Sequence, residues 1–130
     1  MMPSRGFSKS APLAMIVALV LGAASGTPVR AQGGTVVQIN VFEVPAGAED
    51  ATQSRWQAAR DFLKSQPGYI NTRLHRNLDA KGRFTFVNVA EWESPQSFRA
   101  ATEAMNRAQA DNKWPEGVKF TPSLFRVVAQ

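Results

Sequence analysis

Cysteine is absent from the 130 residues of this chain, and histidine occurs once, as His75. Without cysteine there can be no disulfide, no thiolate zinc site, no cysteine-ligated iron–sulfur cluster and no thiol nucleophile. A single histidine supplies no histidine pair for a metal, and the sequence has neither a glycine-rich phosphate-binding loop nor a serine nucleophile elbow. We therefore expect no metal site, and the function classes that depend on these groups are excluded.

A long hydrophobic run is missing as well. The most apolar stretch, Ala11 to Ala24, has 14 residues, whereas roughly 20 are needed to span a bilayer. Two basic residues precede this stretch, and Val29-Arg30-Ala31 follows it with the small-x-small pattern of a signal peptidase site. We expect residues 1–31 to be a signal peptide cleaved after Ala31. The mature protein, residues 32–130, is then secreted or periplasmic, with no stable membrane anchor.

A strong charge of one sign is also lacking in the mature chain, where 12 basic residues stand against 10 acidic ones. The bases Arg55, Arg60 and Lys64 are accompanied by acids, which is typical of a solvated helix face. No basic stripe is left for a nucleic acid, and we expect no nucleic-acid partner.

Hydrophobic periodicity divides the mature chain into six elements. Strands are predicted over residues 35–44, 69–77, 83–93 and 118–128, and helices over 48–66 and from Ser94-Pro95 onward, with Ser94 as the N-cap. Pro122 indicates that the last strand lies at a sheet edge or contains a bulge. The order β-α-β-β-α-β predicts a ferredoxin-like α+β fold, in which one antiparallel sheet carries both helices on one face.

The third predicted strand is apolar on both faces. Phe84, Phe86, Asn88, Ala90 and Trp92 alternate with Thr85, Val87, Val89 and Glu91. The helices cover only one face of such a sheet, so the other face needs a partner. The simplest partner is a second copy, and we expect a homodimer with the two sheets packed face to face.

His75 is the natural candidate for proton transfer, because histidine titrates closest to neutral pH. Asn88 and Trp92 are four residues apart on one strand and share a face, with the small Ala90 between them as the floor of a pocket. Asn40 lies mid-strand, where we expect its amide to have a structural partner.

Two sets of residues are open to a second interpretation. The first is a polar row on one face of the second strand, which either lines a wet cavity or is solvated: Tyr69, Asn71, Arg73, His75 and Asn77. The second has helical spacing and is interpreted as core in preference to a ligand cage: Trp56, Phe62, Leu63 and Phe98.

Taken together, several segments resemble the antibiotic biosynthesis monooxygenase family over about the whole mature chain. They are Pro67-Gly68-Tyr69, His75, the stretch from Phe86 to Ser94, and Gln96-Ser97-Phe98-Arg99, and the most specific part is Asn-x-x-x-Trp-x-Ser from Asn88 to Ser94. The resemblance implies a dimeric α+β barrel. It also implies an enzyme that oxidises aromatic, polyketide-like phenols to quinones with molecular oxygen, using no flavin, metal or nicotinamide cofactor.

By this resemblance the catalytic residues are Asn88 and Trp92, which would hydrogen-bond the substrate oxyanion, and His75, which would move the proton. The implied substrate contacts are Phe86, Phe98, Tyr69 and Asn40. Phe98 replaces a tyrosine of the family, and the family's arginine has only Arg107 as a weak counterpart.

Two alternatives remain. Loss of the tyrosine at Phe98 permits a non-catalytic, small-ligand-binding or stress-related dimer of the same fold. A haem-binding or haem-degrading protein is the other alternative. Asn40 matches the first-strand asparagine of the family's haem-degrading branch, but Ala101 and Asp111 occupy the places of its tryptophan and histidine. The missing histidine removes the evident ligand for haem iron.

Overall fold

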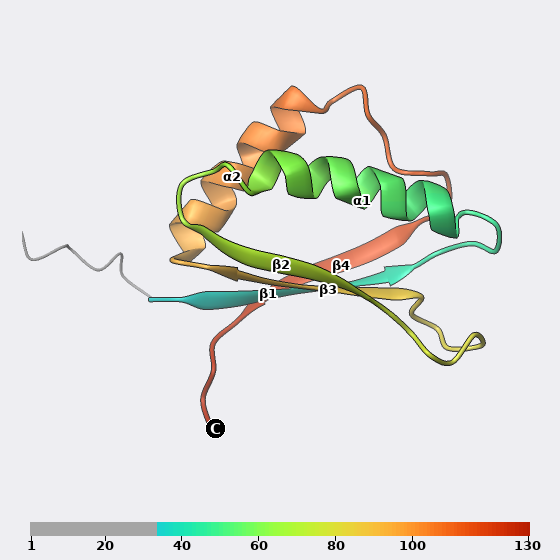
Figure 1. Cartoon of the computed structure of the whole chain (residues 1–130), viewed down its shortest axis with the longest axis horizontal. Helices are drawn as coiled ribbons and strands as arrows, with labels where there is room; N and C mark the ends of the chain where they lie inside the picture. The colour runs from blue at the N-terminus through green and yellow to red at the C-terminus, as the bar shows by residue number, and fades with distance from the viewer. Residues whose placement is uncertain (1–33) are drawn as a thin grey trace, which may run out of the picture.

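The computed structural model describes residues 34–130, which form one four-stranded antiparallel sheet with two helices on one face (Figure 1). The elements are β1 (Val36–Glu43), α1 (Glu49–Leu63), β2 (Tyr69–Arg76), β3 (Phe86–Trp92), α2 (Pro95–Ala108) and β4 (Lys119–Phe125). The strand order β2-β3-β1-β4 confirms the ferredoxin-like α+β prediction. The predicted signal peptide and its cleavage site lie outside the described residues.

The helices begin where the sequence predicts. α1 has Glu49 and Asp50 in its first turn, where the helix dipole favours acids. The Ser94 hydroxyl caps α2 by accepting a hydrogen bond from the Ser97 backbone N–H at 3.1 Å. α1 ends at Leu63 rather than at 66, and a turn leads from there to Gly68. The backbone of Gly68 has a φ of +83°, and a Cβ at this position would collide with the side chain of Ser97, so the position requires glycine.

β3 alternates as predicted. Phe86, Asn88, Ala90 and Trp92 are buried beneath the helices, while the residues between them are half-buried on the opposite face. The neighbouring strand β1 pairs with β3 so that Val36, Gln38, Asn40 and Phe42 lie opposite these four side chains. The helix-facing side of the two central strands therefore has polar amides in its middle and apolar residues at its ends.

β2 departs from the predicted alternation. Its register with β3 shifts between Tyr69 and Asn71, so that Tyr69 lies opposite Trp92 on the helix side, whereas His75 lies opposite Val87 on the other side. An extra residue in a strand reverses the alternation beyond it. The prediction that Tyr69 and His75 share one face is therefore wrong.

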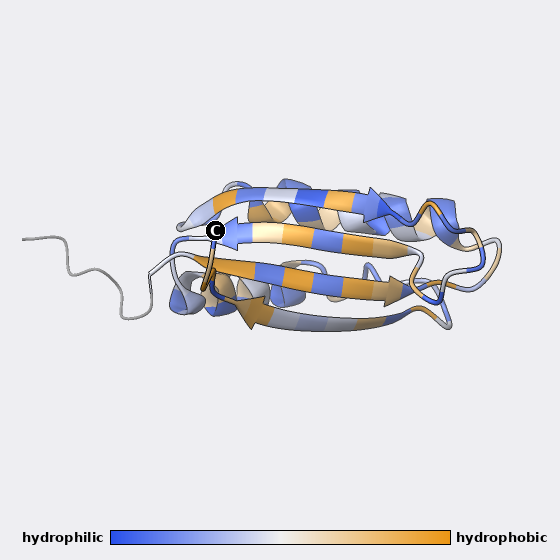
Figure 2. Ribbon diagram, turned by 90° about the horizontal axis from the view of Figure 1, so that it is seen from below, coloured by the Kyte–Doolittle hydropathy of each residue, from blue (hydrophilic) through white to orange (hydrophobic). Residues whose placement is uncertain are grey.

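The sheet face without helices is seen in Figure 2, where apolar residues recur along both central strands. Val37, Ile39 and Val41 of β1 lie beside Val87 and Val89 of β3, and all five are half-buried. The outer strands β2 and β4 are the sheet edges, as Pro122 predicts for β4, which ends at Phe125 rather than at 128. No helix within residues 34–130 is long and apolar enough to cross a membrane.

Candidate functional site

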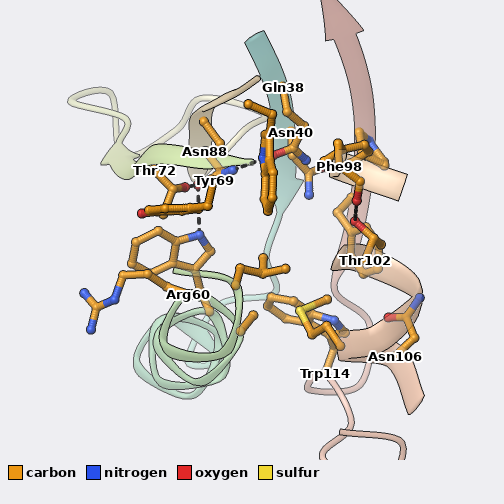
Figure 3. A pocket seen from close by; sticks show the side chains of 18 residues that line it. Gln38, Asn40, Arg60, Tyr69, Thr72, Asn88, Phe98, Thr102, Asn106 and Trp114 are labelled. Carbon is orange, nitrogen blue, oxygen red and sulfur yellow. Dashed lines mark hydrogen bonds between the residues drawn. The ribbon is translucent and has the colours of Figure 1, made fainter. Parts of the chain in front are cut away.

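A cavity of about 350 Å³ lies between the sheet and the two helices (Figure 3). This volume falls in the range of small-molecule sites, roughly 300–1,000 Å³. All six elements contribute to it. Its apolar wall is formed mainly by Trp56, Leu63, Tyr69, Trp92, Phe98, Met105, Trp114 and Phe120. Its polar side chains are Gln38, Asn40, Arg60, Thr72, Asn88, Thr102 and Asn106.

Asn88 is held in one orientation at the sheet side of this cavity. Its Oδ1 accepts hydrogen bonds from Trp56 Nε1 at 3.0 Å and from Thr72 Oγ1 at 2.7 Å, and its Nδ2 donates to Gln38 Oε1 at 2.9 Å. An indole N–H can only donate, so the oxygen of the Asn88 amide must face Trp56. One of the two amide N–H bonds is used by Gln38, and the other has no hydrogen-bond partner among the described residues.

Asn40 lies directly opposite Asn88 in the β1–β3 register. Its Oδ1 is buried and has no hydrogen-bond partner among the described residues. The prediction that the Asn40 amide has a structural partner is therefore wrong for its oxygen. Because a buried polar atom without a partner is costly, this oxygen is a candidate acceptor for a ligand that enters the cavity.

Aromatic rings pack edge to face around one end of the cavity. The Trp92 ring is 5.5 Å from Tyr69 and 5.8 Å from Phe98, measured between ring centroids, with interplanar angles of 86° and 71°. Trp92 is only 1% exposed, and its strand neighbour Ala90 also lines the cavity. The small Ala90 side chain keeps space open between Asn88 and Trp92.

A buried arginine outside the cavity fixes another part of its wall. Arg55 is 7% exposed and donates to the Asn112 carbonyl oxygen and, at 2.8 Å, to Gln109 Oε1. Its guanidinium lies 4.8 Å from the centroid of the Trp114 ring, and burial lowers the pKa of Arg55. Arg55 thereby ties α1 to the connection that leads from α2 to β4 and holds Trp114 at the cavity.

Five of the seven predicted site residues line the cavity: Asn88, Trp92, Tyr69, Phe98 and Asn40. His75 does not. It is exposed on the opposite face of the sheet, and its Nδ1 lies 3.3 Å from the Val87 carbonyl oxygen. The expectation that His75 shares a pocket with Asn88 and Trp92 is wrong, because the register shift in β2 turns it away.

Phe86 is the second exception. It is buried on the helix side of β3 but does not line the cavity, so the expected contact of its ring with a ligand there is wrong. Arg107, the weak counterpart of a family arginine, is exposed and does not line the cavity.

Sequence reasoning missed several wall residues. Helical spacing predicts Trp56 and Leu63 as core and Arg60 as a solvated charge, yet all three line the cavity. A signal existed for Gln38, which is two residues from Asn40 and therefore on the same strand face. None existed for Trp114, which lies outside the regular elements.

A ferredoxin-like sheet with an aromatic cavity under its helices defines an α+β domain with a site of the size that suits a small molecule. The family model for antibiotic biosynthesis monooxygenase matches residues 35–110, and the chain belongs to this family.

Solved structures resemble the whole described domain. A candidate monooxygenase from Shewanella loihica PV-4 is 37% identical, with a TM-score of 0.69 over 75% of this chain and 97% of that one. SnoaB, a cofactor-independent oxygenase from Streptomyces nogalater, is 24% identical, with a TM-score of 0.64 over 75% of this chain and 96% of that one. At that identity SnoaB supports the fold alone.

Haem-degrading proteins are also similar. The haem-degrader MhuD from Mycobacterium tuberculosis, solved with two haems in its active site, is 29% identical, with a TM-score of 0.59 over 73% of this chain and 97% of that one. The mycobilin-producing haem oxygenase of M. tuberculosis strain H37Rv is 35% identical over 65 residues. This alignment covers 50% of the chain and 60% of the relative, so it spans less than two thirds of the relative's length.

Proposed function

We propose that this protein oxidises a phenolic or quinol-type aromatic compound with molecular oxygen, in the cavity under the helices and without a bound cofactor. The observation that carries the proposal is the Asn88 amide, which is locked by its hydrogen bonds and turned toward an aromatic cavity. The rings of Trp56, Tyr69 and Trp92 offer flat apolar surfaces to a planar ligand.

The role proposed for Asn88 follows from its free N–H. A donor that is already oriented in a largely apolar cavity stabilises negative charge as it develops on a substrate oxygen. Asn40 opposite supplies an acceptor, which suits a neighbouring hydroxyl of the substrate. A ligand with one oxyanion and one hydroxyl would satisfy both amides.

No histidine, aspartate or glutamate is among the residues that line the cavity. The substrate must therefore lose its proton without a carboxylate or imidazole base in the wall, which favours compounds that ionise readily, such as anthrones and quinols. In the proposed reaction the substrate carbanion or phenolate supplies the electrons. For an anthrone, one oxygen atom becomes the new quinone carbonyl, and the other leaves as water with the two hydrogens of the oxidised carbon.

Oxygen uptake by the purified protein tests this proposal, with anthrone, naphthol and hydroquinone compounds and no added cofactor. We expect saturable uptake of one O2 per anthrone. Asn88→Asp keeps the acceptor for Trp56 and Thr72 but removes both N–H donors, and it should lower kcat roughly 100-fold or more. His75→Gln is the matched control and should have no effect. Turnover that is unchanged in Asn88→Asp would refute the role of Asn88.

Haem is the second candidate substrate. The unpartnered Asn40 oxygen favours it, together with the similarity to MhuD. The absence of a histidine from the cavity wall speaks against it, because the usual ligand for haem iron is missing. Haem titration separates the two candidates. A saturable Soret shift in the wild-type protein that is lost in Asn40→Ala would favour haem. If the wild-type protein gives no Soret shift, haem is excluded as the substrate. Tight binding of phenols without oxygen uptake would instead indicate a non-catalytic ligand-binding protein.

We also propose that the protein is a homodimer. The strip of Val37, Ile39, Val41, Val87 and Val89 has no helix over it, and a second sheet packed face to face would cover it. Ile39→Asp places a charge in its middle and should give a monomer in sedimentation equilibrium. A wild-type monomer at micromolar concentration would refute the dimer.

Export is proposed from the sequence of residues 1–31 alone. The mass of the protein recovered from the periplasm or medium tests it, since cleavage after Ala31 predicts a chain that begins at Gln32. Recovery of the uncut chain from the cytoplasm would refute export.

A further inference from the structure

Arg60 is the only charged side chain among the residues that line the cavity. It extends from α1, and its side chain is 37% exposed, so it lies where the cavity meets solvent. Figure 3 shows its guanidinium at the outer side of the site, away from Asn40 and Phe98. An entering molecule would pass a positive charge before it reached the amides.

A second, more open hollow begins at the same place. It shares Trp56, Arg60 and Thr72 with the cavity and runs along the edge of the sheet between α1 and β2. Arg60 of α1 and Arg76 on the helix side of β2 line it against one acid, Asp50, and Arg73, which lies opposite Val89 on the other face, borders it at the sheet edge. The approach to the cavity is therefore net positive, although the mature chain as a whole is nearly balanced in charge.

Arg60 is not committed to a strong partner. Its guanidinium lies 5.4 Å from the centroid of the Trp56 ring and pairs at 3.1 Å with its neighbour Asp61, whose side chain is 54% exposed. The hydrogen bond from Arg60 lowers the pKa of Asp61, which keeps this carboxylate ionised. A pair this exposed contributes little, so a ligand anion can replace Asp61 at small cost. Stacking on Trp56 meanwhile keeps the guanidinium beside the cavity.

We propose that the natural ligand is a hydroxylated aromatic carboxylate, whose carboxylate is bound by Arg60 at the mouth while its ring and hydroxyl enter the cavity. The inference rests on the proposed aromatic site and specifies its substrate class. A guanidinium binds a carboxylate through two parallel hydrogen bonds and so orients it as well as attracting it. Arg60 is thus a specificity-determining residue, and it directs the uncharged end of the ring toward Asn88.

Titration calorimetry with two probes that differ only in the carboxylate tests this assignment. The probes are 6-hydroxy-2-naphthoic acid and 2-naphthol, at neutral pH and low salt. We expect the acid to bind about tenfold more tightly than the naphthol, as for a charge-assisted hydrogen bond. In Arg60→Gln the ratio of the two affinities should fall to about one, and in Arg60→Lys it should be intermediate. Arg107→Gln, an exposed arginine of α2 outside the cavity, is the matched control and should keep the wild-type ratio.

The outcomes separate this inference from the function on which it rests. Equal binding of both probes by the wild-type protein, or a ratio that Arg60→Gln does not change, overturns the carboxylate assignment and leaves the aromatic site intact. Failure of both probes to bind overturns the aromatic site and the inference with it. A ratio that also falls as salt rises from 50 to 500 mM would support a charge at the mouth.

Discussion

Asn40 and Asn88 face each other across β1 and β3, and we expect their truncation to alanine to change the free energy of unfolding by different amounts. Asn88→Ala removes the acceptor of Trp56 and Thr72 and the donor to Gln38. A buried group left without its partner costs about 1–3 kcal/mol. Water in the adjoining cavity can satisfy part of this loss, so we expect the free energy of unfolding to fall by about 2–4 kcal/mol in total.

Asn40→Ala removes an oxygen that has no partner among the described residues. The loss of a desolvated, unpaired acceptor offsets the loss of packing. The free energy of unfolding should then stay within about 1 kcal/mol of the wild type or rise. Stability and ligand binding are opposed at this position, because the same oxygen is the proposed acceptor for the ligand.

Urea denaturation followed by far-UV circular dichroism, without ligand, compares the two variants under identical conditions. The difference between them should be at least about 1 kcal/mol, and up to about 5 kcal/mol, in favour of Asn40→Ala. Equal stability of the two variants would refute the argument. It would mean either that the hydrogen bonds of Asn88 contribute nothing or that the Asn40 oxygen has a structural partner after all.

Three further perturbations test the frame that holds the site. Arg55→Met removes both hydrogen bonds of this buried cation and its contact with Trp114. It should lower the free energy of unfolding by about 2–4 kcal/mol in urea denaturation. A loss of less than about 1 kcal/mol would mean that Arg55 does not hold the connection with Trp114 to α1. Ser94→Ala removes the cap of α2 and should cost about 1 kcal/mol in the same assay, whereas an unchanged midpoint would mean that the cap is redundant. The hydrogen bond from Arg83 lowers the pKa of Glu43, so the stabilisation of the fold by this ion pair is present at neutral pH and is lost as pH falls through the lowered pKa. Glu43→Gln should therefore make the fall of Tm from pH 7 to pH 3 shallower. If Tm falls as steeply in the variant as in the wild type, the pair does not stabilise the fold.

The parts of the site that the sequence predicts are those governed by strand alternation. Asn88, Ala90 and Trp92 share a face because β3 is regular, and their partners on β1 follow from the same rule. His75 shows where the rule stops. The register shift between Tyr69 and Asn71 adds one residue, no glycine or proline lies within it, and every later side chain changes face.

The remaining wall could not be predicted because it depends on tertiary packing. Helical spacing tells a buried stripe from an exposed one, but it does not distinguish a core position from a cavity wall, so it does not place Trp56 and Arg60 at the cavity. Trp114 reaches the cavity from an irregular connection that is positioned by Arg55. Its place is fixed by a contact between segments far apart in the chain.

The composition of the cavity wall has a spectroscopic consequence. The chain contains three tryptophans and one tyrosine, and all four, Trp56, Trp92, Trp114 and Tyr69, line the same cavity. The intrinsic fluorescence and near-ultraviolet dichroism of the protein are therefore properties of this one site. An unlabelled sample would report the arrival of a ligand directly, and its emission would also report any loosening of the cavity wall.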